Sequence, residues 1–533
     1  MPEPRQIRIL LELDLDGEIH GFVHAPGGLP GPFTVLDDEG NIREFGPGMI
    51  VTSLPGRSST VFGGGGSGGS ASIVLQRSAL DLWAIRQQTP LQRASGRLLW
   101  LEEGQTLGEA REIHRGALRG NTSVLSGSGG SFSFSLAPPE READIDFPPA
   151  GIADVANNIA RFPTAPTRGL SQVVPVVYGE VLGLPLFPVT AEIAAPGLIR
   201  MIIAGHPIVD AGAGLTLRFS DGTALAGNPH PVVQATDGLG GTYSYVNVTG
   251  TGAGDYGTNA NIHAETVTGW AGAGGAQIDR LGDVLIHAWL TYGRERFDAI
   301  DRERAYYAKP KLNRYRVGSQ FNQGVQGGTL LQALSSRYGS QFPVSFGYTG
   351  GRLGWDATTI PTDKEAANPV RVIIYGRNAF QRSEITETSA DQIRHDFRLA
   401  YGIGGLERGN LSQVNADHTN SGGARRALSR YGQGPKTRLS ASDVPDAGTA
   451  HLLLTDQVRR LSRVRTRVAY MGLDPDWLFL PLLSIVHVTD RDTGWSAEPF
   501  MIESLQPRLD GRVDVGLISH EPDGMDEEAA DGS

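Results

Sequence analysis

The apolar and polar residues at the start of the chain alternate with a period of two, which is typical of a β-strand with one buried face. Five apolar residues between Ile7 and Leu15 fall on one face, and Asp16-Gly17 follows as a turn pair suited to positive φ. A second alternating run at residues 19–24 completes a predicted hairpin. Further elements predicted downstream are strands at 72–75, 96–101 and 131–136 and a short amphipathic helix at 78–86. Together they predict a small β domain over residues 1–140.

The middle of the chain mixes strand and helix periodicities and predicts two domains. Prolines at 138–139 and 148–149 indicate a linker, predicted over residues 141–172 as a connector on the surface. A β-rich domain is predicted over residues 173–275. A small α/β domain is predicted over residues 276–376, because apolar residues recur at helical spacing from Ile278 to Trp289. Its other predicted elements are a helix at 329–338 and strands at 341–348, 352–355 and 370–375.

A second alternating unit is predicted over residues 377–520. Its clearest element is a helix from about Ala447 to Arg463, after which the period changes to two. Three more strands are predicted at 485–488, 500–502 and 513–517, the last two being joined by the turn pair Asp510-Gly511. Residues 521–533 are acidic and poor in apolar side chains, so we expect them to be disordered. The chain is therefore expected to be multidomain and mainly β, with α+β parts.

The bulk composition narrows the classes of function. Hydrophobic residues make up 39% and charged residues 20% of the 533 residues, which indicates a globular protein. The formal net charge is −11 and no basic run stands out, which disfavours a protein that grips nucleic acid. The chain has no cysteine, which excludes disulfides, thiolate metal sites and cysteine nucleophiles.

No targeting or membrane-spanning segment is expected. The first five residues lack the apolar core of a signal peptide. The longest apolar run, Trp477 to Val488, is interrupted by Pro481 and is too short to span a bilayer. Together with the lack of cysteine, these features fit assembly in a reducing cytoplasm.

Two glycine-rich segments match functional patterns by composition alone. Gly65 to Gly69 satisfies G-x-S-x-G, but a nucleophile elbow needs a strand before the serine and a helix after it. The serine here lies inside a glycine run, which is typical of a flexible loop tip. Gly252 to Gly257 satisfies G-x-G-x-x-G, yet residues 258–261 predict a loop and not the helix that a dinucleotide site needs. We expect neither segment to be catalytic or to bind a cofactor.

The candidate metal ligands are better explained by local structure. His20 and His24 have a spacing that suits zinc on a helix, but on a strand they lie about 13 Å apart. The acidic groups Asp14, Asp16 and Glu18, and likewise residues 37–39 before Gly40, do not extend to a twelve-residue calcium loop. Turn chemistry accounts for both groups. We therefore expect no metal site, no cofactor, no catalytic residue and no enzymatic activity.

Two groups of large side chains, arginines and tryptophans, still need a structural interpretation. Five arginines, which form the densest basic feature, are expected to pair with acidic groups of a neighbouring subunit and not with phosphates: Arg459, Arg460, Arg463, Arg465 and Arg467. Five tryptophans stand isolated among aliphatic residues, as core residues do: Trp83, Trp100, Trp289, Trp355 and Trp477. They predict no platform on which bases would stack.

Several stretches together resemble the baseplate hub proteins of bacteriophages. Residues 72–83, 99–104 and 132–139 resemble the first barrel of those hubs, and residues 175–179 resemble the entry into their next domain. The C-terminal order of a helix, three strands and the Asp510-Gly511 hairpin is similar to their last barrel. The family includes the central tail-tip hub of lambda-like siphophages, and the resemblance covers most of residues 5–520.

The resemblance implies a structural role in the virion. Two tube-like β-barrels per chain, at the N- and C-terminus, would form a pseudo-sixfold ring as a homotrimer, with two middle domains outside or below it. That ring would join the hexameric tail tube to tip or fibre proteins, and the distal tail protein and the tape measure protein would be neighbours. Phage DNA would pass through the lumen without specific binding, and three chains at −11 carry a formal −33, which predicts an acidic channel.

Two alternative functions stay open. A receptor- or glycan-binding tail protein would present exposed aromatic side chains in Gly/Asn-rich loops, with Tyr243, Tyr245 and Tyr256 as candidates. The chain shows no fibronectin-like repeats or fibre stalk after the predicted last barrel, which weakens the expectation of direct receptor binding. A cell-wall hydrolase would need paired carboxylates or a metal constellation, and no such pattern is found in the sequence.

Overall fold

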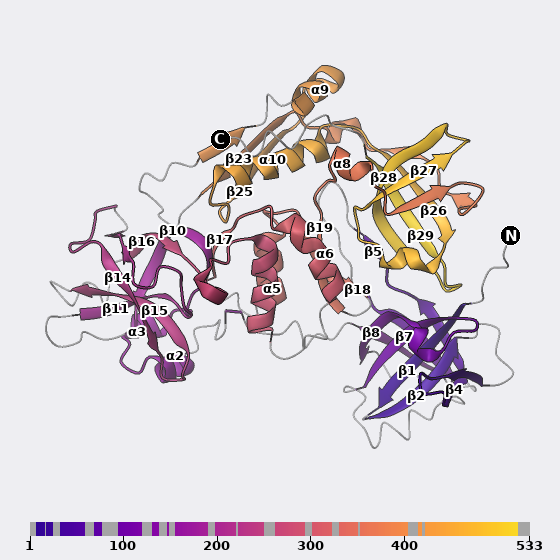
Figure 1. The fold of residues 1–533 in the computed structure, drawn as a ribbon, viewed down its shortest axis with the longest axis horizontal. Helices are drawn as coiled ribbons and strands as arrows, with labels where there is room; N and C mark the ends of the chain where they lie inside the picture. Colours follow the sequence, from indigo (N-terminus) through magenta and orange to yellow (C-terminus); the bar gives the residue numbers. More distant parts are fainter. Residues whose placement is uncertain are drawn as a thin grey trace.

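The computed structural model confirms a multidomain, mainly β protein (Figure 1). The residues that it describes are 7–15, 17–24, 32–58, 69–76, 94–119, 131–137, 147–148, 155–189, 198–219, 222–249, 262–293, 301–321, 330–349, 352–402, 414–417 and 422–520. None of the helices in this part of the chain has the length and apolar character needed to span a bilayer. The predicted helix at 78–86 and the acidic tail lie outside the described residues.

The N-terminal unit is a closed β-barrel. Its strands are β1 (Ile7–Leu15), β2 (Glu18–His24), β3 (Phe33–Leu36), β4 (Ile42–Ser53), β6 (Ala71–Gln76), β7 (Ser95–Glu102), β8 (Arg111–Arg119) and β9 (Ser131–Ala137). They follow the order β2-β1-β7-β8-β9-β6-β4-β3, and a parallel pairing of β2 with β4 closes the barrel. The predicted hairpin is β1–β2, and its turn uses Gly17 at φ +92°.

A second β unit follows two short helices, α2 (Val155–Arg161) and α3 (Thr167–Leu170). Its strands are β10 (Val176–Pro188), β11 (Leu198–Ala204), β12 (Gly214–Leu215), β13 (Leu217–Phe219), β14 (His230–Thr236), β15 (Thr242–Thr249), β16 (Ile262–Thr268) and β17 (Gly318–Phe321). The two helices occupy the stretch predicted as a surface connector. Most described side chains of this stretch are exposed or half-buried, while Asn158 and Phe162 are buried and Phe147 packs edge-on against Tyr292 and Phe321. The linker over residues 141–172 stays a prediction.

A mixed unit of helices and small sheets occupies the middle of the molecule in Figure 1. Its elements are α5 (Leu281–Tyr292), α6 (Arg302–Leu312), α7 (Leu330–Tyr338), β18 (Val344–Thr349), β19 (Arg352–Ala357), α8 (Asp363–Ala366), β23 (Asp396–Tyr401), β24 (Val414–Asp417), α9 (Gly422–Tyr431), β25 (Lys436–Ala441) and α10 (Ala447–Leu461). One apolar core contains side chains from α5, α6, α7, β23 and α10. Helix α10 therefore packs with residues far before it in the sequence.

The C-terminal unit is a sheet that rolls into a second barrel. Its strands are β20 (Arg371–Ile374), β21 (Gln381–Arg382), β22 (Thr386–Glu387), β26 (Thr466–Leu473), β27 (Ile485–Asp490), β28 (Trp495–Pro507) and β29 (Val513–Ser519), in the order β20-β27-β28-β29-β26-β21. Strands β21 and β27 are four positions apart in this order. Nevertheless Arg382 Nε lies 3.0 Å from the Asp490 carboxylate, which requires a strongly curved sheet.

Candidate functional site: the joint between the two barrels

The two barrels share one order of strands. In the N-terminal barrel β6 is followed by β7, β8 and β9 and pairs with β9, which gives the order β7-β8-β9-β6. In the C-terminal barrel β26 is followed by β27, β28 and β29 and pairs with β29, which gives β27-β28-β29-β26. The outer neighbours also correspond, because β1 and β20 flank β7 and β27 while β4 and β21 flank β6 and β26. The two units are therefore topological equivalents.

Equivalent positions can be read from the strand pairs. The last pair of β6 and β9 is Gln76 with Ser131, and its counterpart is Leu473 with Val513. The last pair before the β7–β8 turn is Trp100 with Arg111, and its counterpart is Asp490 with Trp495. We call the β7–β8 turn region of the first barrel and the β27–β28 turn region of the second the leading end. We call the end of β6 with the start of β9, and the end of β26 with the start of β29, the trailing end.

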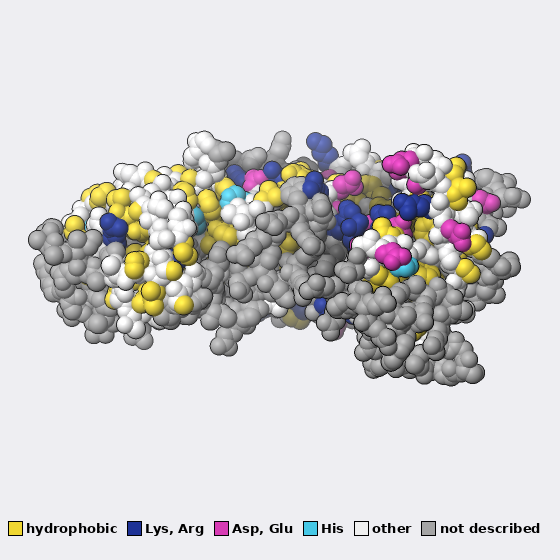
Figure 2. All heavy atoms as spheres, turned by 90° about the horizontal axis from the view of Figure 1, so that it is seen from below, with side chains coloured by type: hydrophobic (Ala, Val, Ile, Leu, Met, Phe, Trp, Pro, Cys, Tyr) yellow, Lys and Arg dark blue, Asp and Glu magenta, His cyan; other side chains and the backbone are white. Residues whose placement is uncertain are grey.

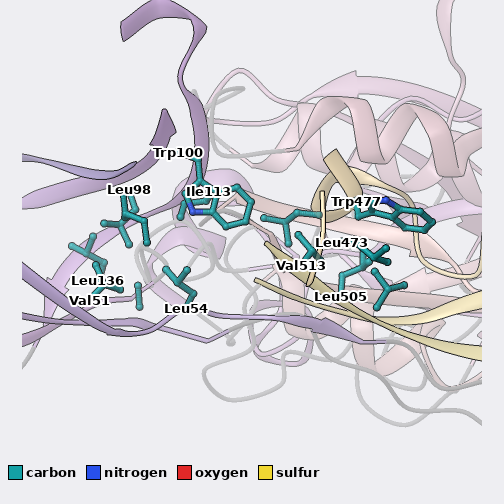
Figure 3. Close-up of a cluster of buried hydrophobic side chains, with 14 of the residues drawn as sticks. Val51, Leu54, Leu98, Trp100, Ile113, Leu136, Leu473, Trp477, Leu505 and Val513 are labelled. Atoms are coloured by element: carbon teal, nitrogen blue, oxygen red, sulfur yellow. The ribbon is translucent and has the colours of Figure 1, made fainter. Parts of the chain in front are cut away.

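The leading end of the N-terminal barrel packs on the trailing end of the C-terminal barrel (Figure 3). The figure shows buried side chains of the first barrel, including Trp100 and Ile113, facing Leu473, Trp477 and Val513 of the second. All of these side chains belong to one apolar cluster and are at most 6% exposed. Burying one such side chain contributes about 1.5–3 kcal/mol, so the two barrels form a permanent apolar joint.

A short strand in the segment that follows β4 of the first barrel pairs with the second barrel. After β4 the chain leaves the first barrel, and Arg57–Ser58 forms β5, which pairs antiparallel with Leu505 and Ser504 of β28. The side chain of Gln506 donates a hydrogen bond to the Leu54 carbonyl at 3.0 Å. Backbone pairing of this kind fixes both distance and direction, because strand neighbours lie about 4.8 Å apart. The connection therefore holds the barrels in one orientation.

The Arg57 side chain ties the joint to the middle of the molecule. It is 6% exposed, and its Nη1 donates to the Leu478 carbonyl at 3.1 Å. Its Nη2 lies 3.9 Å from the Asp356 carboxylate on β19. Arg304 of α6 holds the same carboxylate with two hydrogen bonds, from Nε at 2.8 Å and from Nη2 at 2.6 Å. Three parts of the chain therefore meet at one buried carboxylate.

The electrostatics of this junction depend on the ion pairs. Burial alone would raise the pKa of Asp356, but the positive charges of Arg304 and Arg57 outweigh it and keep that pKa below its ordinary value. Burial lowers the pKa of Arg57, while the Asp356 charge opposes this shift. A buried carboxylate with two guanidinium partners is stable only while all three groups are in place.

The rim of the joint is ionic and half exposed. Arg111 of β8 forms an ion pair with Asp476, which lies just after β26 in the 3₁₀ helix Pro475–Phe479. The same guanidinium lies over the Phe479 ring, 5.7 Å from its centroid. At the predicted Asp510-Gly511 turn, the space for a Cβ at Gly511 is filled by the Ile7 side chain. Glycine is therefore required there both for its φ of +77° and for the close approach of the first barrel.

The candidate metal ligands serve local structure in the part of the chain that is described. His20 lies 3.8 Å from Glu18 on the same strand, and His24 Nδ1 accepts a hydrogen bond from the Val51 amide at 3.0 Å. Asp14 accepts from the Gly17 amide, and Asp37 accepts from the Glu39 and Asn41 amides. No group of three potential ligands is found among the described residues. Asp16 lies outside them.

The arginine cluster has partners within its own chain, which corrects the expectation that it pairs with a neighbouring subunit. Arg460 pairs with Asp456 at 2.5 Å, and Arg467 pairs with Glu503 at 2.8 Å. Arg465 is 1% exposed and donates to the carbonyls of Ser519 and Arg459, both at 2.6 Å. Of these side chains, Arg465 connects α10 to strand β29 of the second barrel. Among the described residues on the face shown in Figure 2, basic and acidic side chains lie side by side.

The aromatic candidates for glycan binding are in part wrong. Tyr243 is 3% and Tyr245 is 5% exposed, and both pack with Phe162 in a small core. Buried rings cannot stack on a sugar, so these two residues do not form the expected platform. Tyr256, the G-x-G-x-x-G segment and the serine of the G-x-S-x-G segment lie outside the described residues.

Four of the five tryptophans predicted as core residues are buried, namely Trp100, Trp289, Trp355 and Trp477, while Trp83 lies outside the described residues. Arg57 and Asp356 could not be identified from the sequence, because neither belongs to a periodic pattern or motif. The only local signal was the Pro55-Gly56 pair, which interrupts the strand before Arg57.

Comparisons with known proteins add a coarse likeness. No family model and no curated protein matches the sequence. Among solved structures, the chain is similar to a chain of the virion of a native gene transfer agent particle, at 13% identity and a TM-score of 0.37, over 70% of this chain and 93% of that one. It is also similar to a tail protein from Neisseria meningitidis MC58, at 9% identity and a TM-score of 0.37, over 96% of both chains.

A further similar structure is the prophage tail protein gp18 from Listeria monocytogenes EGD-e, at 9% identity and a TM-score of 0.25, over 64% of this chain and 87% of that one. Two of these three structures are thus described as tail proteins and one as part of a virion. Because these three TM-scores are below 0.5, this likeness does not by itself assign a function to the chain. A function for this chain therefore has to be inferred from the geometry of the joint.

Proposed function

We propose that the chain is the structural hub of a bacteriophage tail tip, and that three copies close into a pseudo-sixfold ring around the DNA channel. The observation that carries this proposal is the pair of topologically equivalent barrels, joined rigidly within one chain. Three chains with two equivalent barrels each supply six similar units, which is the number needed to match a hexameric tube. A contact that repeats head to tail forms a closed ring when the rotation between successive units closes.

The joint has the properties of a structural contact and not of a reaction centre. Its centre is apolar, its single buried carboxylate is held by two arginines, and its rim is closed by an ion pair. The proposed role is therefore non-enzymatic and needs no cofactor. In the virion the ring would connect the tail tube and the distal tail protein to tip or fibre proteins, with the tape measure protein inside the tube.

The charge of the chain fits a channel that lets DNA pass. Each arginine or lysine on a channel wall would hold a phosphate and release counterions. Four of the five arginines of the densest cluster are instead buried, and two members of the cluster pair with acidic groups of the same chain. With a formal charge of −11 per chain, the proposed lumen repels the phosphate backbone and does not grip it.

The proposal is tested by the copy number of the full chain in solution and in tail particles. Light scattering of the purified protein is expected to give about 170 kDa, three times the 56.8 kDa chain. Electron cryomicroscopy of tails is expected to show six barrels around the axis, alternating between N- and C-terminal ones. A chain that is monomeric in the particle, or barrels that lie at different distances from the axis, would overturn the proposal.

A further inference from the structure

The in-chain joint uses only one end of each barrel, and this leaves two ends without a barrel partner in the same chain. The leading end of the N-terminal barrel contacts the trailing end of the C-terminal barrel. In the C-terminal barrel these ends lie at opposite ends of β28, whose 13 residues span up to roughly 43 Å at about 3.3 Å per residue. The contact is therefore head to tail and can repeat from one molecule to the next.

The leading end of the C-terminal barrel is polar and accessible. Asp490 and Trp495 end the paired part of β27 and β28, and the turn between them carries Arg491 and Asp492. The Asp492 side chain is 64% exposed, and Arg491 is also exposed. In the N-terminal barrel the equivalent positions, Trp100 and Arg111, are the ones that contact the second barrel.

At the trailing end of the N-terminal barrel, the described residues that end β6 and begin β9 are polar as well. Gln76 is exposed and Ser131 is half buried, whereas their equivalents Leu473 and Val513 are at most 1% exposed under the first barrel. The two trailing ends differ in polarity because their contacts would form at different times. The in-chain joint is permanent and can be apolar, but a surface that meets its partner only on assembly has to stay soluble before that.

We propose that the turn from Asp490 to Trp495 of one copy binds the trailing end of the N-terminal barrel, at Gln76 and Ser131, of a second copy. This inference rests on the proposed ring and names its contact surfaces. The partner is a second copy, because the trailing end of the N-terminal barrel is the counterpart of the trailing end that the C-terminal barrel already uses within the chain. The interface between copies is then a polar version of the in-chain joint, and the ring is built from one repeated geometry.

Paired cysteine substitutions test this contact cleanly, because the natural chain contains no cysteine. Asp492→Cys and Gln76→Cys chains, carrying different tags, are produced together and treated with a short bismaleimide. A covalent dimer of the two tagged chains is expected. Thiols held in contact react at a much higher effective concentration, so its yield should exceed that of the control by about tenfold or more.

The matched control replaces Gln76→Cys by Glu103→Cys, an exposed position at the leading end of the same barrel. That end is occupied by the in-chain joint, so little dimer is expected with Asp492→Cys. A second control, the double variant Arg111→Cys/Asp476→Cys, should crosslink within one chain, because these residues contact each other there. It shows that the barrels keep their in-chain arrangement when cysteines are introduced.

The outcomes separate this inference from the proposed function. A trimer in which Asp492→Cys crosslinks to Gln76→Cys and not to Glu103→Cys supports both. A trimer with equal or no crosslinking at the two positions overturns the inference and leaves the ring standing. A chain that stays monomeric in solution and in tails, with no dimer in any mixture, overturns both. Crosslinking of Asp492→Cys only to another tail protein in assembled tails identifies a different occupant and also overturns the inference.

Discussion

The N- and C-terminal barrels reach the same order of strands in different ways. The first closes through the parallel pair β2–β4, whereas within the described residues of the second no strand bridges β20 and β21. The strand that flanks each four-strand unit also differs in direction, because β1 is antiparallel to β7 while β20 is parallel to β27. Only the four-strand unit and its flanking positions are common to both. What both barrels retain is thus the part that forms the joint, and what varies is the part that closes each barrel.

The two trailing ends carry the same lesson at the level of side chains. Leu473 and Val513 are apolar where the other barrel covers them, and Gln76 and Ser131 are polar where it does not. At equivalent backbone positions, the residue is therefore apolar where the other barrel covers it and polar where it does not. Changes at the joint and at its equivalents can break or sharpen this comparison.

The largest effect is expected from Asp356→Ala, because it leaves Arg57 and Arg304 buried without their carboxylate. Removing one member of a buried ionic group costs about 3–5 kcal/mol of unfolding free energy. Urea unfolding of the full chain measures this loss. The control is Asp301→Ala, which removes the N-cap of α6 but leaves the Asp356 carboxylate in place, and it should cost about 1 kcal/mol. Equal losses for both variants would contradict a central role for the buried carboxylate.

A comparable loss is expected from Leu473→Ala, at the covered trailing end. Removing a buried leucine side chain costs about 2–5 kcal/mol through lost transfer energy and the cavity left behind. The equivalent change Gln76→Ala, at an exposed position, should stay within about 0.5 kcal/mol. Thermal unfolding of the two variants measures the difference. If both changes cost the same, the two trailing ends are not covered differently.

A smaller loss of stability is expected when the pH is lowered, because of His114. This residue is buried in the first barrel, and its Nε2 lies 2.7 Å from the Leu136 carbonyl. Burial lowers the pKa of His114, although that hydrogen bond and Glu112 oppose the shift. The unfolded chain gains a proton near pH 6.5 while the folded histidine stays neutral, so stability falls as the pH drops below about 6.5. Unfolding free energies from pH 7 to 5 should decline less in His114→Gln. An identical decline in both proteins would contradict the prediction.

The smallest effect is expected from Arg111→Ala at the rim of the joint. Both partners of the Arg111–Asp476 ion pair are more than 40% exposed, so solvent screens the interaction. Exposed ion pairs contribute about 0–1 kcal/mol, and added salt should reduce that further. Unfolding at low and high salt measures this contribution. A loss of several kcal/mol would mean that the rim, and not the apolar centre, holds the barrels together.

Much of the strand content was predictable from alternation alone. The expected strands at 72–75, 96–101, 131–136, 485–488 and 513–517 all lie within observed strands, and the helices near 278–289 and 447–463 were placed within a few residues. Helix α6 was missed, because Arg302–Leu312 is highly charged and contains Pro310. Its buried residues Ala305, Ala308 and Leu312 give too weak an apolar signal to mark a helix. The domain boundaries remain predictions.

The sequence by itself determined the elements and their class, because a period of two or of 3.6 is a local property of neighbouring residues. The tertiary structure decided that two such units share a strand order, that β5 enters the other barrel, and that Arg57 meets Asp356 from 299 positions away. It also decided that Tyr243 and Tyr245 are buried and that the arginine cluster pairs within its own chain. Contacts of this range depend on which surfaces meet after folding, and no local pattern of residues encodes that.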